Sequence, residues 1–370
     1  MSHNMATSDD ERAESIRLIR DSAAAVAPSG GDLKRIRGWR FKAPCFDPAV
    51  WAEMGSLGWT GLRVPEDAGG AGLGMGEFCA LAEALGSGLV PEPFVASALS
   101  ASLLAAALAH ADSLRGSGEA GEALAAVLGG KALVLTAWQE RANTLDVPGT
   151  HGAPRLFLPM AGGASHFLVP VREGAGLALY LQSADGADLA LEFTQDGGSF
   201  GTLRPHGGVK VMDDASAVLA IGLGEAALGT AAMLLGVMDR AFAMTLDYLK
   251  TRTQFGRAIG AFQTLQHRAA DLKIQIALTR ASVEAAAATL DAGAVGPHRT
   301  AVIARAKARA AEASMLVTRQ AIQLHGGIGY TDEHDIGLYL RKAMVLANQF
   351  GGAALHRRAF MAAAPETADD

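Results

Sequence analysis

The chain has 370 residues, of which half are hydrophobic, 19% are charged and only 6% are aromatic. This length is enough for a large core, and an apolar content of mostly alanine, leucine and valine favours closely packed helices. The net charge of −6 argues against a nucleic-acid-binding surface. Two cysteines, Cys45 and Cys79, predict neither a disulfide framework nor a metal site. With no apolar run of about 18 residues and no signal-peptide core, we expect a cytoplasmic protein that does not insert into a membrane.

Helical periodicity dominates the first 130 residues. The pair Asp47-Pro48 marks a helix start, because aspartate caps a first turn and proline is tolerated at its first position. A glycine cluster before Met75 lacks the spacing G-x-G-x-x-G, so we interpret it as a loop before a helix and not as a dinucleotide site. The predicted helices are Asp9–Val26, one through Trp51 and Met54, Met75–Leu85, Ser97–Ala109 and Glu119–Leu128.

After Gly130 the pattern changes twice. Short apolar runs broken by glycine clusters predict strands at 131–138, 167–171 and 177–182. Four long periodic segments joined by glycine-bearing turns then predict a helical bundle. These four helices are predicted at 217–249, 262–292, 299–324 and 335–347. We therefore predict an α+β, mainly α fold with an N-terminal helical domain at 1–130, a small β domain at 131–214 and a C-terminal bundle at 215–370.

The connection between the first two bundle helices, residues 247–271, has an unusual composition for a turn. Arg252, Gln254, Phe255 and Arg257 lie beside glycines in this stretch. Guanidinium groups pair with phosphate, glycine allows close approach of the backbone, and phenylalanine can stack on a ring. The stretch therefore suits an anionic, planar ligand, although a solvated basic connection between helices has the same composition.

Two motifs resemble those of a known family. The sequence RTQFGRAIGAFQ, from Arg252, is similar to the signature R-x-Q-F-G-x-x-I-x-x-F-Q of the acyl-CoA dehydrogenase flavoproteins, and IQLHGGIGY at 322–330 is similar to their Q-x-x-G-G-x-G-Y. The resemblance implies FAD, an acyl-CoA substrate and a fold of N-terminal helices, a small β barrel or sandwich and a four-helix bundle. In this family both motifs clamp the pyrophosphate and adenine half of an FAD held mainly by the neighbouring subunit. The FAD-binding residues that it implies are Arg252, Gln254, Phe255, Gln323, Gly326, Gly327 and Thr136.

The catalytic base of the family is missing from its usual position. The family reaction needs a carboxylate that takes the Cα proton of the acyl-CoA, while the flavin takes the hydride from Cβ. The resemblance places Phe350 where the usual glutamate stands, so no catalytic residue is assigned there. Some members carry the base on the first bundle helix, at the position of Ala226. Glu225 is adjacent but rotated by about 100° around the helix, and it is the candidate for a displaced base, with Glu140 as the other nearby carboxylate.

The β domain also departs from the family pattern. Its segment LTAWQE keeps Thr136, one of the residues whose hydroxyl would bond the flavin ring. The later family segment W-I-T corresponds to Phe157-Leu158-Pro159, where a proline offers neither hydroxyl nor backbone N–H. The sequence therefore retains the residues that would bind the FAD of a neighbouring subunit. It lacks most of the residues that would bind the flavin ring of its own FAD.

This asymmetry is similar to that of the small subunits of pimeloyl-CoA and steroid side-chain acyl-CoA dehydrogenases. Membership implies an α2β2 heterotetramer with a second acyl-CoA dehydrogenase subunit, in which this chain has no autonomous active site and an electron-transfer acceptor reoxidises the flavin. Two alternatives stay open: a homo-oligomeric flavoprotein of the same fold with oxygen-using chemistry, and a non-catalytic scaffold. We interpret His267 and His325 as packing residues, and Arg305, Lys307 and Arg309 as one solvated stripe.

Overall fold

The computed structural model describes residues 2–28, 30–110 and 116–364. Contacts divide the chain into two compact units, each assembled from stretches that are distant in the sequence. The helical unit joins Met1–Leu33, Gly74–Val90 and Leu228–Asp370. The mixed unit joins Lys34–Leu73 and Pro91–Ala227. The long helix α7 (Ser216–Thr251) contributes residues to both.

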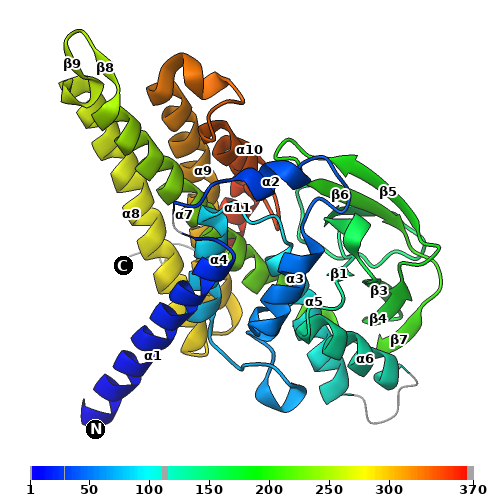
Figure 1. Cartoon of the computed structure of the whole chain (residues 1–370). Helices are drawn as coiled ribbons and strands as arrows, with labels where there is room; N and C mark the ends of the chain where they lie inside the picture. Colours follow the sequence, from blue (N-terminus) through cyan, green and yellow to red (C-terminus); the bar gives the residue numbers. More distant parts are fainter. Residues whose placement is uncertain (1, 29, 111–115, 365–370) are drawn as a thin grey trace. The chain divides into compact units, whose positions relative to one another are not determined.

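The helical unit contains a bundle of long helices and one short hairpin (Figure 1). The hairpin connects the ends of α7 and α8, and a short turn connects α8 to α9. The elements of this unit besides α7 are α1 (Ser2–Ser22), η1 (Ala23–Ala25), α4 (Met75–Ser87), β8 (Thr253–Gln254), β9 (Arg257–Ala258), η5 (Ile259–Ala261), α8 (Gln263–Asp291), α9 (Gly296–His325), η6 (Gly326–Tyr330), α10 (Ile336–Leu346) and α11 (Ala353–Ala363).

Three helices form the core near the hairpin. Apolar residues recur at helical spacing on α7, α8 and α9, so each helix presents one continuous apolar stripe to the other two. Burying each large aliphatic side chain in such a core stabilises it by about 1.5–3 kcal/mol. The buried residues of this cluster are Leu235, Met238, Phe242, Leu249, Ala269, Leu272, Ile276, Ala313, Val317 and Leu324.

Helices α4 and α7 approach closely through two glycines. A Cβ at Gly236 would lie 1.9 Å from the carbonyl oxygen of Glu83, and one at Gly86 would lie 2.1 Å from that of Met233. Each glycine thus accepts the backbone of the other helix where a side chain would clash. This reciprocal contact fixes how α4 lies along α7.

The mixed unit contains short helices and two sheets, one in the order β1-β3-β4-β7 and the other in the order β2-β6-β5. The first sheet joins a parallel pair, β1 with β3, to antiparallel neighbours. The elements of this unit are α2 (Lys34–Trp39), α3 (Pro48–Ser56), η2 (Trp59–Gly61), η3 (Glu66–Ala68), α5 (Phe94–Ala109), α6 (Ser117–Leu128), β1 (Val134–Thr136), β2 (Arg155–Pro159), η4 (Ala161–Gly163), β3 (His166–Glu173), β4 (Gly176–Ser183), β5 (Asp188–Phe193), β6 (Ser199–Arg204) and β7 (Val209–Met212).

The observed fold class, α+β and mainly α, confirms the prediction. The Asp47 carboxylate accepts a hydrogen bond from the Ala49 N–H at 3.0 Å, so the predicted start of α3 is the observed one. Helices α2 and α11 and strands β2, β5, β6 and β7 were not predicted. The division into three domains stays a prediction.

Helix α7 is long and apolar enough to cross a membrane. In the part of the chain that the structure describes, it is the one helix that meets both criteria, and 72% of its most apolar window is buried by the rest of the protein. The core helix of a soluble protein has the same properties. This helix therefore gives no reason to place the chain in a membrane.

Candidate functional site

The connection between α7 and α8 is a β-hairpin and not the plain turn that we predicted. Gln254 of β8 pairs with Arg257 of β9, and the two residues between them form the turn. Phe255 has φ +52° and Gly256 has φ +76°, the two positive values that a two-residue type I′ hairpin requires. The glycine at the second turn position was the signal in the sequence.

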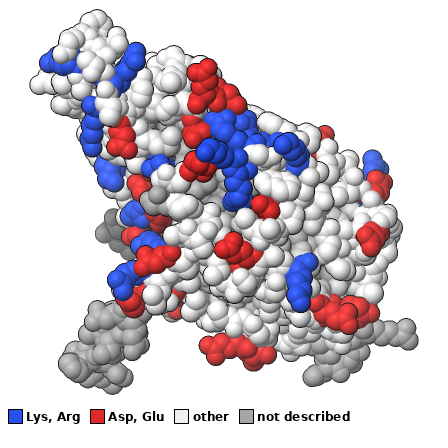
Figure 2. All heavy atoms as spheres, viewed as in Figure 1, with Lys and Arg blue, Asp and Glu red and all other residues white. Residues whose placement is uncertain are grey.

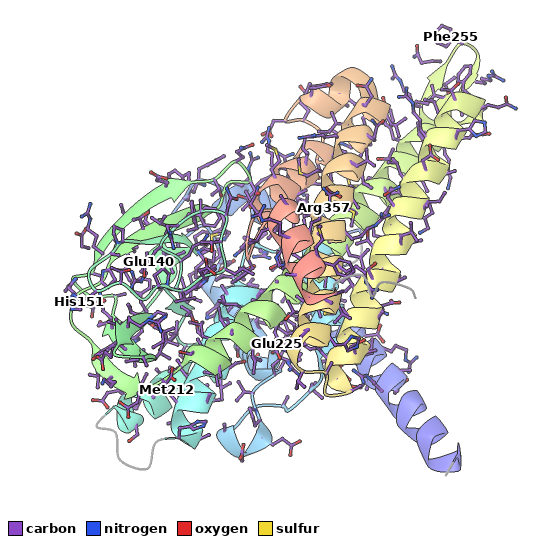
Figure 3. The ribbon with its side chains drawn as sticks, turned by 180° about the vertical axis from the view of Figure 1, so that it is seen from behind. Glu140, His151, Met212, Glu225, Phe255 and Arg357 are labelled. Carbon is purple, nitrogen blue, oxygen red and sulfur yellow. The ribbon has the colours of Figure 1, made fainter. Side chains whose placement is uncertain are left out.

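Phe255 is held in the solvent at the end of this hairpin (Figure 3). Its side chain is 91% exposed, and its positive φ is a strained conformation for an aromatic residue. Its ring lies edge-on to Phe262 at 6.2 Å, and the guanidinium of Arg257 lies 4.2 Å from the Phe262 ring centre. Figure 2 shows this end as uncharged surface with basic side chains beside it. The hairpin therefore presents an aromatic ring together with cations.

The second motif lies at the C-terminal end of α9. Gly326 ends the helix with φ +64°, and its N–H donates to the carbonyl of Gln323. A Cβ at Gly326 or Gly327 would meet no atom within 4 Å, so the backbone here is open to an approaching ligand. Gln323, Gly326 and Gly327 are all exposed.

A stack of rings joins the two motifs. Tyr248, one turn before Arg252, lies parallel to His325 with ring centres 4.6 Å apart, and His334 lies 4.6 Å from His325. His325 is buried, its Nδ1 lies 2.7 Å from the Ala321 carbonyl, and burial lowers its pKa. The predicted packing role of His325 agrees with this geometry. Sequence reasoning did not identify Tyr248, although its spacing of four from Arg252 places both on one helix face.

The exposed polar groups of both motifs can bind an anion. Arg252 lies at the base of the hairpin, where its carbonyl accepts a hydrogen bond from the Ile259 N–H at 2.8 Å. Within residues 2–28, 30–110 and 116–364 its guanidinium forms no ion pair. The amides of Gln254 and Gln323 add further exposed donors. This donor set fits a pyrophosphate, and the Phe255 ring fits a planar group beside it.

Phe350 lies in the turn between α10 and α11 and its side chain is buried. It has φ +53°, and its carbonyl oxygen lies 2.8 Å from Nε2 of the buried His356. No carboxylate replaces the one that the resemblance expects here. The position is filled by an apolar side chain and cannot abstract a proton.

Both candidate carboxylates form ion pairs. Glu225 on α7 (Figure 3) lies 3.1 Å from the guanidinium of Arg63, which also donates to the Leu73 carbonyl. Glu140 lies 3.0 Å from Arg155, a fully buried arginine, and accepts the Thr150 N–H. Paired carboxylates of this kind anchor loops. Glu225 as a displaced base stays a prediction.

Thr136 is buried on β1 and hydrogen-bonded to α5. Its hydroxyl lies 2.9 Å from that of Ser100, which can also donate to the Ala96 carbonyl at 3.3 Å. Either hydroxyl can be the donor, and the pair engages the Thr136 hydroxyl within the chain. Pro159 ends β2 without an N–H. Thr136 and Pro159 therefore fit an isoalloxazine ring poorly. The exposed donors of the two motifs, in contrast, fit the anionic half of FAD.

Two protein-family models match this chain. Residues 13–112 match the N-terminal domain of acyl-CoA dehydrogenase, and residues 217–364 match its C-terminal domain. Together these matches cover more than half of the sequence. The chain belongs to the acyl-CoA dehydrogenase family, whose members bind FAD. The predicted enzyme class, an oxidoreductase acting on acyl-CoA, is confirmed.

Its relatives include proteins of steroid and lipid metabolism. The chain is 30% identical over 342 residues to acyl-CoA dehydrogenase IpdE2 of Mycolicibacterium smegmatis, covering 91% of this chain and 95% of that protein. It is similar to a chain of the Tcur3481-Tcur3483 steroid acyl-CoA dehydrogenase, with a TM-score of 0.82, 28% identity and 96% and 98% of the two chains covered. It is also similar to a chain of the ChsE4-ChsE5 complex of Mycobacterium tuberculosis, with a TM-score of 0.80, 26% identity and the same coverage. The predicted relation to steroid and pimeloyl-type dehydrogenases is confirmed.

Proposed function

We propose that this chain is the subunit of a heteromeric acyl-CoA dehydrogenase that completes the FAD site of a catalytic partner. The observation that carries the proposal is the hairpin, which holds Phe255 91% exposed in a strained conformation. Arg252, three residues earlier, is exposed and forms no ion pair with any residue that the structure describes. Strain at a fully exposed aromatic ring does not stabilise the chain itself, and such outliers cluster at ligand clamps. A molecule outside this chain is the natural partner of that ring.

The retained residues bind and orient the cofactor. Arg252, Gln254 and Gln323 donate to the pyrophosphate, the open backbone at Gly326 and Gly327 admits its oxygens, and Phe255 covers an aromatic face. Bound FAD supplies the acceptor for the hydride that leaves Cβ of the acyl-CoA. In this scheme no residue of this chain moves a proton, and the base belongs to the partner.

Two further observations support a partner subunit. The base position is occupied by the buried Phe350, and the Thr136 hydroxyl is engaged by Ser100. A similar solved structure is named as the ChsE4-ChsE5 complex, in which two different chains assemble. By analogy we propose an α2β2 assembly in the cytoplasm, a steroid or other lipid acyl-CoA as substrate, and an electron-transfer protein as oxidant of the flavin.

The test is the visible absorbance of the protein purified alone and after co-expression with each candidate acyl-CoA dehydrogenase chain. We expect a colourless protein alone and a yellow complex with one partner. In that complex, Arg252→Ala should remove most of the flavin, while Arg305→Ala, at an exposed position on α9, should not. A protein that binds one FAD per chain alone and oxidises acyl-CoA would refute the partner role.

A clamp without a base also suits flavin chemistry that needs no proton abstraction. A homo-oligomer that consumes oxygen with reduced flavin would establish that alternative. A protein that stays colourless with every candidate partner would establish the scaffold alternative. The exposed guanidinium-bearing Arg252 favours FAD binding over the scaffold.

A further inference from the structure

Lys307 lies inside the helical unit and not on a solvated stripe. Its side chain is fully buried on α9, so the predicted exposure of this residue is wrong. Positions 305 and 309 share a helix face, whereas position 307 is turned by about 200° from position 305 and faces the core. The Nζ atom donates to two carbonyl oxygens at the end of α10, at 3.2 Å to Leu346 and 3.0 Å to Ala347.

The number of acceptors matches a neutral amine. A neutral amine has two N–H donors, whereas an ammonium group has three and needs a third partner or an anion. Among the residues that the structure describes, no carboxylate pairs with Lys307. Glu312, five residues further along α9, pairs with Arg357 of α11 (Figure 3). Because burial without a counter-charge disfavours the cation, the pKa of Lys307 is lowered to about 7.

His356 holds the other side of the same turn. It is buried on α11, and its Nε2 donates to the Phe350 carbonyl at 2.8 Å. It is the titratable group of α11 that acts on Lys307, and the carbonyl oxygens of Leu346 and Ala347 accept from the amine. Burial and the nearby Lys307 lower the pKa of His356 to about 4, so it is neutral wherever Lys307 titrates. Two uncharged donors therefore fix residues 346–350 from opposite helices.

We propose that neutral Lys307 and His356 together hold residues 346–350 in place. We further propose that these residues are released more readily as the pH falls, because Lys307 gains a proton when they are released. This segment includes Phe350, the position at which the resemblance expects the catalytic base. The contacts of Lys307 and His356 therefore set the conformation of that position. The inference does not depend on the proposed partner, because these contacts lie wholly within the helical unit.

The pH range follows from the two states of Lys307. When residues 346–350 are released, the amine is in water with an ordinary pKa of about 10.4. Between pH 7 and about 10, the released state therefore holds one more proton than the state in which they are held in place. In that range each fall of one pH unit favours release by up to about tenfold, and below pH 7 the effect levels off because both states are protonated.

Hydrogen exchange of the full-length chain tests this inference. The reporters are the amides of residues 347, 348, 349 and 351, which donate within or beside the turn. After correction for intrinsic exchange, we expect their opening equilibrium to be up to about a hundredfold larger at pH 7 than at pH 9. The β3–β4 hairpin of the mixed unit serves as an internal reference.

Two variants separate charge from hydrogen bonding. Lys307→Gln keeps two N–H donors without a titratable amine and should remove the pH dependence. Arg305→Gln takes a cation from the exposed face of the same helix and should keep it. Wild-type protection that does not change between pH 7 and pH 9, or an unchanged pH dependence in Lys307→Gln, would overturn the proposal.

If Lys307→Gln does not fold, the protonation state of Lys307 can be measured directly in the wild-type chain. Lysines labelled with 13C at Cε report their own titration by NMR. We expect one lysine to titrate near pH 7. If every lysine titrates near its ordinary pKa, Lys307 is charged while it holds residues 346–350, and the proposal is refuted.

Discussion

The rings of Tyr248 and His325 lie parallel, 4.6 Å apart, and connect the last turn of α7 to the last residue of α9. The first ring precedes the hairpin motif, and the second precedes the glycines of the second motif. This ring contact therefore connects the two motifs, the hairpin at 252–258 and the glycines at 326–327. Positioning by a packed aromatic pair demands the shape of the ring and not its hydroxyl.

Replacing Tyr248 with leucine should loosen this connection. Aromatic pairs contribute about 0.5–1.5 kcal/mol beyond buried area, so we expect a loss of about 1 kcal/mol in the free energy of unfolding. The flavin content of the co-expressed complex should fall as well. Tyr248→Phe keeps the stack and should keep both properties, as measured by thermal unfolding and absorbance.

Replacing Phe255 with asparagine should separate stability from function. Asparagine tolerates positive φ, so relief of strain should raise the free energy of unfolding by about 0.5–1 kcal/mol. The complex should nevertheless lose flavin, since the exposed ring is absent. Met361→Asn, on the exposed surface of α11, is the matched control and should leave flavin content unchanged. A Phe255→Asn complex with full flavin would show that the ring has no role in binding.

Glu225→Gln tests whether a displaced base exists. Because its carboxylate pairs with Arg63, we expect turnover of the complex to change less than twofold and stability to fall slightly. A loss of turnover of a hundredfold or more, without loss of flavin, would instead assign Glu225 as the base. Glu53→Gln, on the exposed surface of α3, controls for the change in charge.

Acid should destabilise the protein through His356. Its pKa is about 4 when folded and about 6.5 when unfolded, so the unfolded chain binds more protons between these values. Stability is therefore lost as the pH falls from 6.5 to 4, by about 3 kcal/mol for this group. Urea unfolding across this range should show a shallower slope in His356→Gln than in the wild type. His298→Gln, an exposed histidine, should keep the wild-type slope.

Gly236→Ala should disrupt the contact between α4 and α7. Its Cβ would lie 1.9 Å from the Glu83 carbonyl oxygen, so the backbone must move, and we expect a cost of about 3 kcal/mol or more. Gly121→Ala, inside α6 with only ordinary contacts, should instead gain about 0.5–1 kcal/mol. Thermal unfolding of both variants measures the difference.

The sequence predicted the long helices because their apolar residues repeat at helical spacing and glycines separate them. It did not predict α11, although the apolar residues of this helix do recur on one face. It also did not predict β5, which is largely exposed and pairs only with β6. The hairpin motif was identified from its residues, although its strands were not. Such short strands are defined by pairing and not by composition.

The electrostatic details could not be predicted from the sequence. The pairs Glu225–Arg63 and Glu140–Arg155 join residues that are far from helical spacing, so only the fold brings them together. Lys307 was different, because its position relative to Arg305 already placed it on the opposite helix face. A helical wheel would have placed Lys307 on the buried face of α9. Its carbonyl partners, Leu346 and Ala347, could not be predicted, because only the tertiary structure brings them to α9.

The discontinuity of the helical unit has a consequence for synthesis on the ribosome. Helix α4 leaves the ribosome early, but the segment of α7 that receives its glycine contact follows only after residues 91–227. At about 5–20 residues per second, the nascent chain carries the unpacked apolar face of α4 for about 7–27 seconds. The mixed unit has all of its residues by then and can fold first. A chain released before α9 is complete would therefore contain a folded mixed unit and helices with exposed apolar faces. Chaperones and proteases would bind those faces.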